Sequence, residues 1–186
     1  MKKAIAVFIF MTLLVSGCGL GKEKEYQMES FTFKNQNGEN FGTEQLKGEV
    51  WIADFIFTSC ETVCPPMTVA MAALQKQLEE ENLNIQLVSI SVDPDVDTPE
   101  KLKEFMQKFS KDESNWNMLT GYTQKEIETF AREEFQSLVQ KPESSDQVIH
   151  GTNFYLVNRH GEIVDDYSFT QGKQFQELIS DVKKQL

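Results

Sequence analysis

The chain has 186 residues, of which 40% are hydrophobic, and a formal net charge of −11. This length suits one compact domain with a sizeable core and is short for two. So acidic a surface makes nucleic acid a poor partner, because phosphate backbones repel it, and anionic lipid headgroups repel it in the same way.

The first segment resembles the export signal of a bacterial lipoprotein. Two lysines precede an apolar run of thirteen residues, 4–16, which is shorter than the ~20 residues of a membrane-spanning helix. The run ends in VSGC, which resembles a lipobox with Cys18 as its last residue. We therefore expect residues 1–17 to be a signal peptide, Cys18 to be lipidated, as by palmitate, and residues 18–25 to tether the protein to the extracytoplasmic side of the cell membrane. The alternative is an ordinary secreted protein with one odd cysteine.

The following residues, 26–186, are predicted to form one α/β domain that begins with a hairpin. Phe31 and Phe33 alternate in strand fashion before the turn-forming residues 35–40. Residues 50–57 and 85–92 are almost continuously apolar, as in strands buried on both faces of a parallel sheet. Between these strands, apolar side chains recur at helical spacing at Met67, Met71, Leu74 and Leu78. The pattern predicts a strand, helix and parallel strand.

The second half of the chain continues the alternation of strands and helices. The predicted elements are a helix capped by Thr98, a short strand at 116–119, a helix opened by the T-x-x-E capping box at 123–126, strands at 148–157 and 162–167, and a last helix near 175–182. This order predicts an α/β sandwich of thioredoxin type with an added N-terminal β-hairpin.

Two cysteines in the stretch FTSCETVCPPM are the first candidates for chemistry. Cys60 lies just beyond the first core strand, and Cys64 begins the following helix. A helix N-terminus stabilises thiolates, so we expect lowered pKa values and reactive thiols. A structural disulfide is a weak explanation, because a bridge across four residues constrains the unfolded chain little. A redox pair and half of a metal site both remain, although the usual spacing for thiol exchange is C-x-x-C.

A third ligand would separate these alternatives, and two histidines are available. His160 falls in a turn between strands and is expected to be solvated. His150 stands at the start of a strand beside Gly151, and its residue pattern alone fits a structural role as well as a ligand role. Two thiolates and an imidazole suit copper best, and zinc takes the same ligands and stays open.

The motifs around these residues resemble the Sco (SenC) family of cytochrome c oxidase assembly proteins. The resemblance rests on FxFTxCxxxCP at 55–65, on DPxxDTPE at 93–100, and on His150 followed by Thr152 and an apolar strand. It spans essentially the whole domain after the signal. Ile149 and Ile56 depart from it, since many relatives have an acid and a glycine at these positions.

The resemblance implies a metallochaperone rather than an enzyme. It implies that Cys60, Cys64 and His150 bind one copper ion, Cu(I) or Cu(II), and that the partner is cytochrome c oxidase subunit II, whose CuA site would receive copper or have its cysteines prepared. Asp93, at the end of its strand, is a further hypothesis as an outer-sphere group.

Two alternative functions use the cysteines alone. The first is a thiol-disulfide oxidoreductase in which Cys60 and Cys64 are the redox-active pair. Thioredoxin-type enzymes usually place a proline opposite their cysteines, and the only proline after Pro99 is Pro142, in a polar loop, which favours the metal site. The second, weaker alternative is a thiol peroxidase, because peroxiredoxins share the fold.

Overall fold

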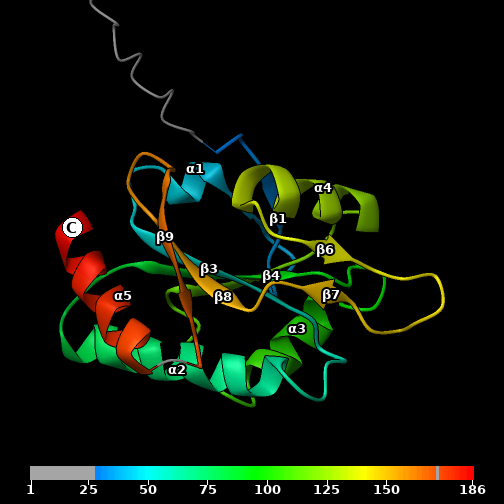
Figure 1. The fold of residues 1–186 in the computed structure, drawn as a ribbon, viewed down its shortest axis with the longest axis horizontal. Coiled ribbons are helices and arrows are strands. Elements are labelled where there is room, and N and C mark those ends of the chain that lie inside the picture. The colour runs from blue at the N-terminus through cyan, green and yellow to red at the C-terminus, as the bar shows by residue number, and fades with distance from the viewer. Residues whose placement is uncertain (1–27, 171) are drawn as a thin grey trace, which may run out of the picture.

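A five-stranded mixed sheet forms the centre of the computed structural model, which describes residues 28–170 and 172–186 (Figure 1). Its strands, in spatial order, are β5 (Trp116–Leu119), β4 (Gln86–Ser91), β3 (Trp51–Ile56), β8 (Asn153–Val157) and β9 (Ile163–Ser168). β3 and β4 pair in parallel, as do β4 and β5, whereas β8 runs antiparallel to β3 and β9 antiparallel to β8. The predicted parallel strand pair is confirmed.

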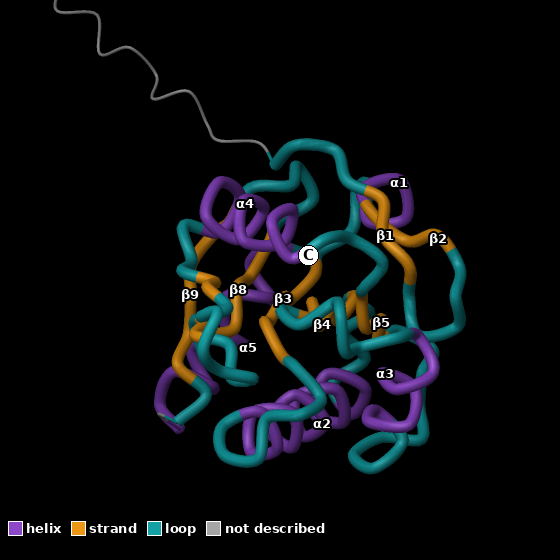
Figure 2. The backbone as a smooth tube through the Cα atoms, turned by 90° about the vertical axis from the view of Figure 1, so that its right-hand side faces the viewer, coloured by secondary structure: helices purple, strands orange, loops and turns teal. Residues whose placement is uncertain are grey.

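Helices cover both faces of this sheet (Figures 1 and 2). On one face lie α2 (Cys64–Glu80), α3 (Pro99–Met106) and α5 (Gly172–Gln185), and on the other lie α1 (Thr43–Leu46) and α4 (Gln124–Phe135). Every residue of β3 is buried, because this strand is central and covered on both sides. The sandwich predicted from the alternating pattern is therefore present.

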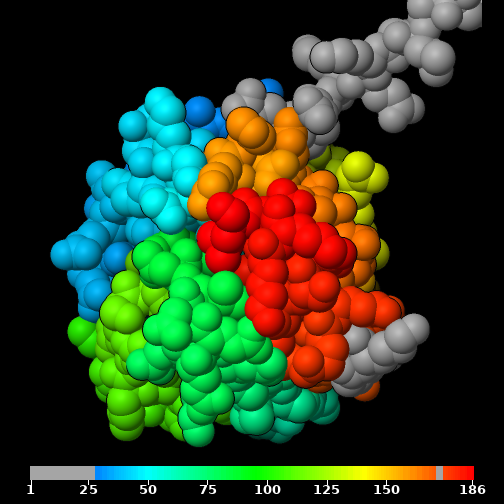
Figure 3. All heavy atoms as spheres, turned by 90° about the vertical axis from the view of Figure 1, so that its left-hand side faces the viewer, coloured from blue at the N-terminus to red at the C-terminus, as the bar shows by residue number. Residues whose placement is uncertain are grey.

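The helix starts follow from local chemistry. The Thr98 side chain accepts a hydrogen bond from the backbone N–H of Lys101, and Pro99 occupies the first position of α3. Thr123 and Glu126 form the predicted capping box at the start of α4. On the face of the molecule shown in Figure 3, α5 lies beside the C-terminal end of α2, where Lys183 forms an ion pair with Glu81. These contacts fix the helices that flank the sheet.

Two small hairpins stand outside the main sheet. β1 (Thr32–Lys34) pairs with β2 (Asn40–Gly42), which confirms the predicted N-terminal hairpin. β6 (Val139–Gln140) pairs with β7 (Ile149–His150) in a separate two-stranded sheet that the pattern did not predict. We name β6 and β7 together the histidine ribbon.

The prediction of one continuous strand over residues 148–157 is wrong. The chain leaves strand geometry at Gly151 and Thr152, so that β7 pairs with β6 while β8 pairs with β3. The break separates His150 from the central sheet. The predicted signal peptide at 1–17, the lipidated Cys18 and the tether at 18–25 lie outside the described residues.

Candidate metal centre

The cysteine-bearing loop lies at the carboxyl end of β3, where ligands bind in open α/β sheets. α2 begins at Cys64, as predicted, and both thiols are free and buried. Pro65 and Pro66 follow directly, and neither has an N–H to donate. Because Cys64 is the first residue of the helix, its backbone N–H has no acceptor within the helix, and it points to Cys60 Sγ at 3.4 Å. The local sequence thus ties the first sulfur to the helix start.

His150 reaches the same place from the other half of the chain. Its Nε2 lies 3.7 Å from Cys64 Sγ, although the two residues are 86 positions apart. Its Nδ1 lies 2.7 Å from the carbonyl oxygen of Gly151, which accepts the Nδ1 proton and leaves a lone pair on Nε2. The Phe57 ring meets the imidazole edge-on, with centroids 5.5 Å apart. The imidazole therefore presents its unprotonated nitrogen to the thiol of Cys64.

Burial and hydrogen bonding set the protonation states of this group. Burial raises the pKa of Cys60, but backbone N–H groups at Cys64, Thr62 and Val63 outweigh it, and the net pKa is lowered. Burial raises the pKa of Cys64 far above its usual value, with smaller upward contributions from Cys60 and Asp54. Burial lowers the pKa of His150, partly offset by its bond to Gly151, so the ring stays neutral at pH 7.

The prediction that the helix start lowers the pKa of both thiols is thus confirmed for Cys60 and wrong for Cys64. Cys64 is completely buried, and desolvation of its thiolate outweighs the helix N-terminus. The pair is therefore asymmetric, with an ionisable outer thiol and a protonated inner one.

The three predicted ligands meet only in part. Cys64 and His150 are in contact, while Cys60 Sγ is turned to the N–H of Cys64 and lies 3.8 Å from Thr62 Oγ1. Within residues 28–170 and 172–186, no three His, Cys, Asp or Glu side chains stand close enough to hold a metal ion as they are. The donor set fits a soft metal in chemistry, since it offers two sulfurs and an imidazole nitrogen.

Asp93 lies at the end of β4 and does not contact these three side chains through any hydrogen bond of the described residues. It is almost fully buried, and its Oδ1 lies 2.6 Å from Lys141 Nζ. Lys141 follows directly after β6, so Asp93 is linked to the histidine ribbon. His160, by contrast, is exposed in its turn, as expected, with its N–H bonded to Asn158 Oδ1.

Asp54 is a buried carboxyl group that the sequence pattern did not lead us to single out. It lies within β3, is completely buried, and neither carboxylate oxygen has a hydrogen-bond partner. Burial raises its pKa to about 7, and the hydroxyl of its cross-strand neighbour Ser89, which does not reach hydrogen-bond geometry with it, offsets only part of this effect. The signal was present in the sequence as one acid within the apolar run VWIADFIF.

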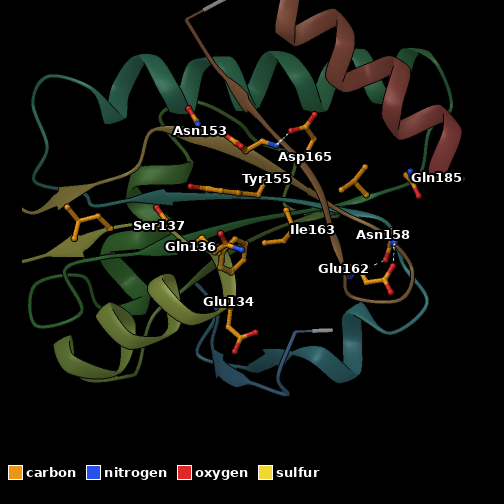
Figure 4. Close-up of a pocket in the computed structure, with 14 residues that line it drawn as sticks. Glu134, Gln136, Ser137, Asn153, Tyr155, Asn158, Glu162, Ile163, Asp165 and Gln185 are labelled. Atoms are coloured by element: carbon orange, nitrogen blue, oxygen red, sulfur yellow. Dashed lines mark hydrogen bonds between the residues drawn. The ribbon is translucent and has the colours of Figure 1, made fainter. Parts of the chain in front are cut away.

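The cavity drawn in Figure 4 does not include the candidate ligands in its lining. Its volume is about 800 Å³, and it is lined by the end of α4, by residues 136–138 that follow this helix, by strands β8 and β9, and by Gln185 at the end of α5. Its labelled side chains are mostly polar, and among them the Asn158 amide donates a hydrogen bond to Glu162 at 2.7 Å. None of Cys60, Cys64 and His150 lines it. The candidate ligands therefore lie outside this cavity.

In the part of the chain that the structure describes, no helix combines the length and the apolar character needed to cross a bilayer.

Comparison with known proteins gives consistent relatives. The SCO1/SenC family model matches residues 21–186. The SCO1 protein homolog of Bacillus subtilis is 49% identical over 174 residues, which cover 92% of this chain and 90% of that protein. The crystal structure of a SCO1/SenC family lipoprotein from Bacillus anthracis superimposes with a TM-score of 0.83 over 89% of this chain and 98% of that one, and the two sequences are 53% identical.

Two further structures bear on function. BsSco, described as a member of the Sco family of cytochrome c oxidase assembly proteins that contains a disulfide switch, is 51% identical, with a TM-score of 0.78, over 86% of this chain and 93% of that one. Arabidopsis thaliana ScoI, solved with copper bound, is 25% identical, with a TM-score of 0.72, over 86% of this chain and 99% of that one. The thioredoxin-like fold predicted from the sequence is confirmed by these likenesses.

Proposed function

Because the chain belongs to the SCO1/SenC family, we propose that it is a copper-binding assembly factor for cytochrome c oxidase, with Cys60, Cys64 and His150 as ligands of one copper ion. The observation that carries the proposal is the 3.7 Å approach of His150 Nε2 to Cys64 Sγ beside the Cys60 thiol. Relatives solved with copper bound support it, as does the match of two thiolates and an imidazole to copper.

The protonation states suit capture of a metal cargo. Cys60 has the lowered pKa and supplies the more available thiolate, and His150 presents a neutral nitrogen. Cys64 would have to lose its proton on binding, so copper uptake should release a proton and weaken as the pH falls.

The partner we propose is subunit II of cytochrome c oxidase. The protein would either deliver copper to the CuA site or reduce the cysteines of that site for loading. Membership of BsSco in a family of cytochrome c oxidase assembly proteins supports this partner. The acidic surface, with its net charge of −11, excludes neither role and disfavours nucleic acid.

We place the protein on the outer side of the cell membrane, held by a lipid on Cys18 after removal of residues 1–17. The lipobox-like VSGC and the lipoprotein relative from Bacillus anthracis support this localisation. A Cys18→Ser variant should no longer be found in the membrane fraction of the producing cells, and mass spectrometry should show that it lacks the acyl chains. Unchanged membrane association would contradict lipidation.

The copper site is tested by metal titration of residues 19–186, a fragment that contains every described element and lacks the additional thiol of Cys18. Chelator competition under anaerobic conditions would give the affinity, and absorption would report sulfur-to-Cu(II) charge transfer. We expect a tight one-to-one site that is lost in His150→Ala and in Cys60→Ser. His160→Ala is the matched control, because this histidine is exposed and lies in a turn.

A thiol-disulfide oxidoreductase is the second candidate, favoured by the asymmetry of the two thiols. Cys60 would attack a disulfide of the partner, Cys64 would then displace it, and the pair would end as a disulfide while the partner gains two thiols. This activity would survive His150→Ala, whereas copper binding would not. Retained exchange with oxidised subunit II, together with weak copper binding in the parent, would favour this function.

A further inference from the structure

One short segment contacts both the loop that carries Cys60 and the residue that follows β6 of the histidine ribbon. Residues 93–97 lie in the connection between β4 and α3, and we name them the acidic bracket. At its end, Asp97 accepts hydrogen bonds from Thr58, from the N–H at 3.1 Å and from Oγ1 at 2.5 Å. Thr58 is two residues before Cys60, so this arm holds the cysteine loop. At its start, Asp93 pairs with Lys141, and this arm holds the histidine ribbon.

The acidic bracket is itself fixed in the fold. The N–H groups of Val96 and Asp97 donate to the Asp93 carbonyl at 3.0 and 2.9 Å. Ser91 Oγ donates to Asp97 Oδ2 at 2.6 Å, and Thr120 Oγ1 donates to the Asp97 carbonyl at 2.7 Å. Both acids are almost completely buried. Because the bracket is held rigidly, a displacement of Asp93 would also displace Asp97.

The histidine ribbon has little backbone pairing of its own, although Val139 in β6 and Val148 beside β7 are buried in the core. It forms a two-stranded sheet separate from the five-stranded sheet, with two residues in each strand. Such a ribbon is marginally stable without further packing. The polar loop between its strands, 141–148, begins at Lys141, whose N–H bonds to Glu128 Oε1 on α4 at 3.0 Å. Side-chain contacts must therefore hold His150 opposite Cys64.

The Lys141–Asp93 ion pair is the charged contact among them. The Lys141 side chain is 22% exposed and that of Asp93 is 1% exposed, so the pair is shielded from water on the Asp93 side. Loss of one partner of a buried pair leaves the other charge without compensation, which is costly. The Asp93 carboxylate would then recruit water or another cation, and the start of the ribbon loop would lose its attachment to the acidic bracket.

We propose that Lys141 is a positioning residue for the metal centre: through its ion pair with Asp93 it holds the histidine ribbon at the place where His150 can complete the ligand set with Cys60 and Cys64. This role rests on the proposed function, in which His150 is a copper ligand. Lys141 acts through His150 and does not itself bind the metal.

The first test uses the metal-free fragment 19–186 and does not depend on copper. In NMR spectra, the parent should show nuclear Overhauser effects between the His150 and Phe57 rings, whose centroids are 5.5 Å apart. Lys141→Met keeps much of the aliphatic stem and removes the charge, and it should weaken or abolish these effects. Lys141→Arg should retain them, because a guanidinium can still pair with Asp93.

The second test measures copper affinity by chelator competition and histidine ligation by nitrogen coupling in pulsed EPR of the Cu(II) form. We expect Lys141→Met to bind ~10-fold or more weakly with reduced nitrogen coupling, in the range known for partners that orient metal ligands. Lys141→Arg should stay close to the parent. Lys184→Met, which removes a lysine paired with Asp181 on α5, is the matched control and should bind as the parent does.

A double variant separates positioning from the cost of an unpaired charge. Asp93→Asn combined with Lys141→Met has no orphaned carboxylate, so it should fold even if Lys141→Met does not. We expect it to recover stability but to bind copper as weakly as Lys141→Met. Parent-like affinity in the double variant, or parent-like affinity and ring contacts in Lys141→Met, would overturn the positioning role.

The outcomes also separate this proposal from the proposed function. If His150→Ala binds copper as tightly as the parent, the ligand assignment fails. If His150→Ala loses copper while Lys141→Met keeps both its affinity and its ring contacts, only the role of Lys141 fails.

Discussion

Asp54 gives the stability of this protein a pH dependence that one substitution should remove. The side chain is completely buried in β3, and neither of its oxygens has a hydrogen-bond partner. Burial raises its pKa from 3.8 to about 7 in the folded protein. In the unfolded chain the carboxyl loses its proton near 3.8, whereas in the folded protein it keeps the proton until about pH 7. Folding is therefore favoured less as the pH rises.

The size of the effect follows from this difference. A shift from 3.8 to about 7 is roughly three pKa units, and each unit corresponds to about 1.36 kcal/mol, which gives an upper value of about 4 kcal/mol. The free energy of unfolding should fall by up to this amount between about pH 4 and pH 7 and level off above, because the folded state binds one proton more in that window. This contribution is fully present below pH 4.

Urea denaturation of the parent and of Asp54→Asn at pH 4.5, 6 and 8, followed by circular dichroism, would measure the effect. We expect the parent to lose several kcal/mol relative to the variant across this range, since the amide has no charge to gain. Asp165→Asn, at an exposed position of β9, is the control and should keep the slope of the parent. An identical slope in the parent and Asp54→Asn would refute the reasoning.

Three further predictions concern the surroundings of the candidate ligands. Iodoacetamide at pH 7.5 should modify Cys60 well before Cys64, because the pKa of Cys60 is lowered and that of Cys64 is raised; equal rates by mass spectrometry would contradict this. Gly151→Ala would place its Cβ 2.5 Å from Ser137 Oγ, so urea denaturation should show a loss of about 1–3 kcal/mol, and a stability equal to the parent would mean that the site relaxes freely. Asp97→Ala leaves three donor groups without their acceptor, the N–H and Oγ1 of Thr58 and Oγ of Ser91, and should lower the free energy of unfolding by about 1–3 kcal/mol or more in the same assay. Asp95→Ala, at an exposed position, should not lower it, and comparable losses in the two variants would argue against the contacts of the acidic bracket.

Most elements of the fold could be predicted because each has a local signal. The buried strand at 51–56 follows from a continuous apolar run between turn residues, and α2 from apolar residues at helical spacing. The starts of α3 and α4 follow from Thr98 and from the capping box at Thr123. The histidine ribbon has no such signal, since its strands have two residues each and pair across a polar loop. The strand break at Gly151 depends on that pairing and was missed with it.

The candidate ligands could be predicted from the sequence, whereas the residues that hold them in place could not. Cys60 and Cys64 stand four residues apart at a strand end, and His150 is one of only two histidines, so residue type and position pointed to all three. Their supports act across the fold: Lys141 meets Asp93 over 48 residues, and Thr58 meets Asp97 over 39. A lysine in a polar loop has no pattern that distinguishes it from a solvated one. Its role depends on a buried carboxylate that only the packed sheet brings within 2.6 Å of its ammonium group. The candidate ligands can therefore be found from short motifs in the sequence. The contacts that orient them involve residues such as Lys141, which can be recognised only in the folded structure.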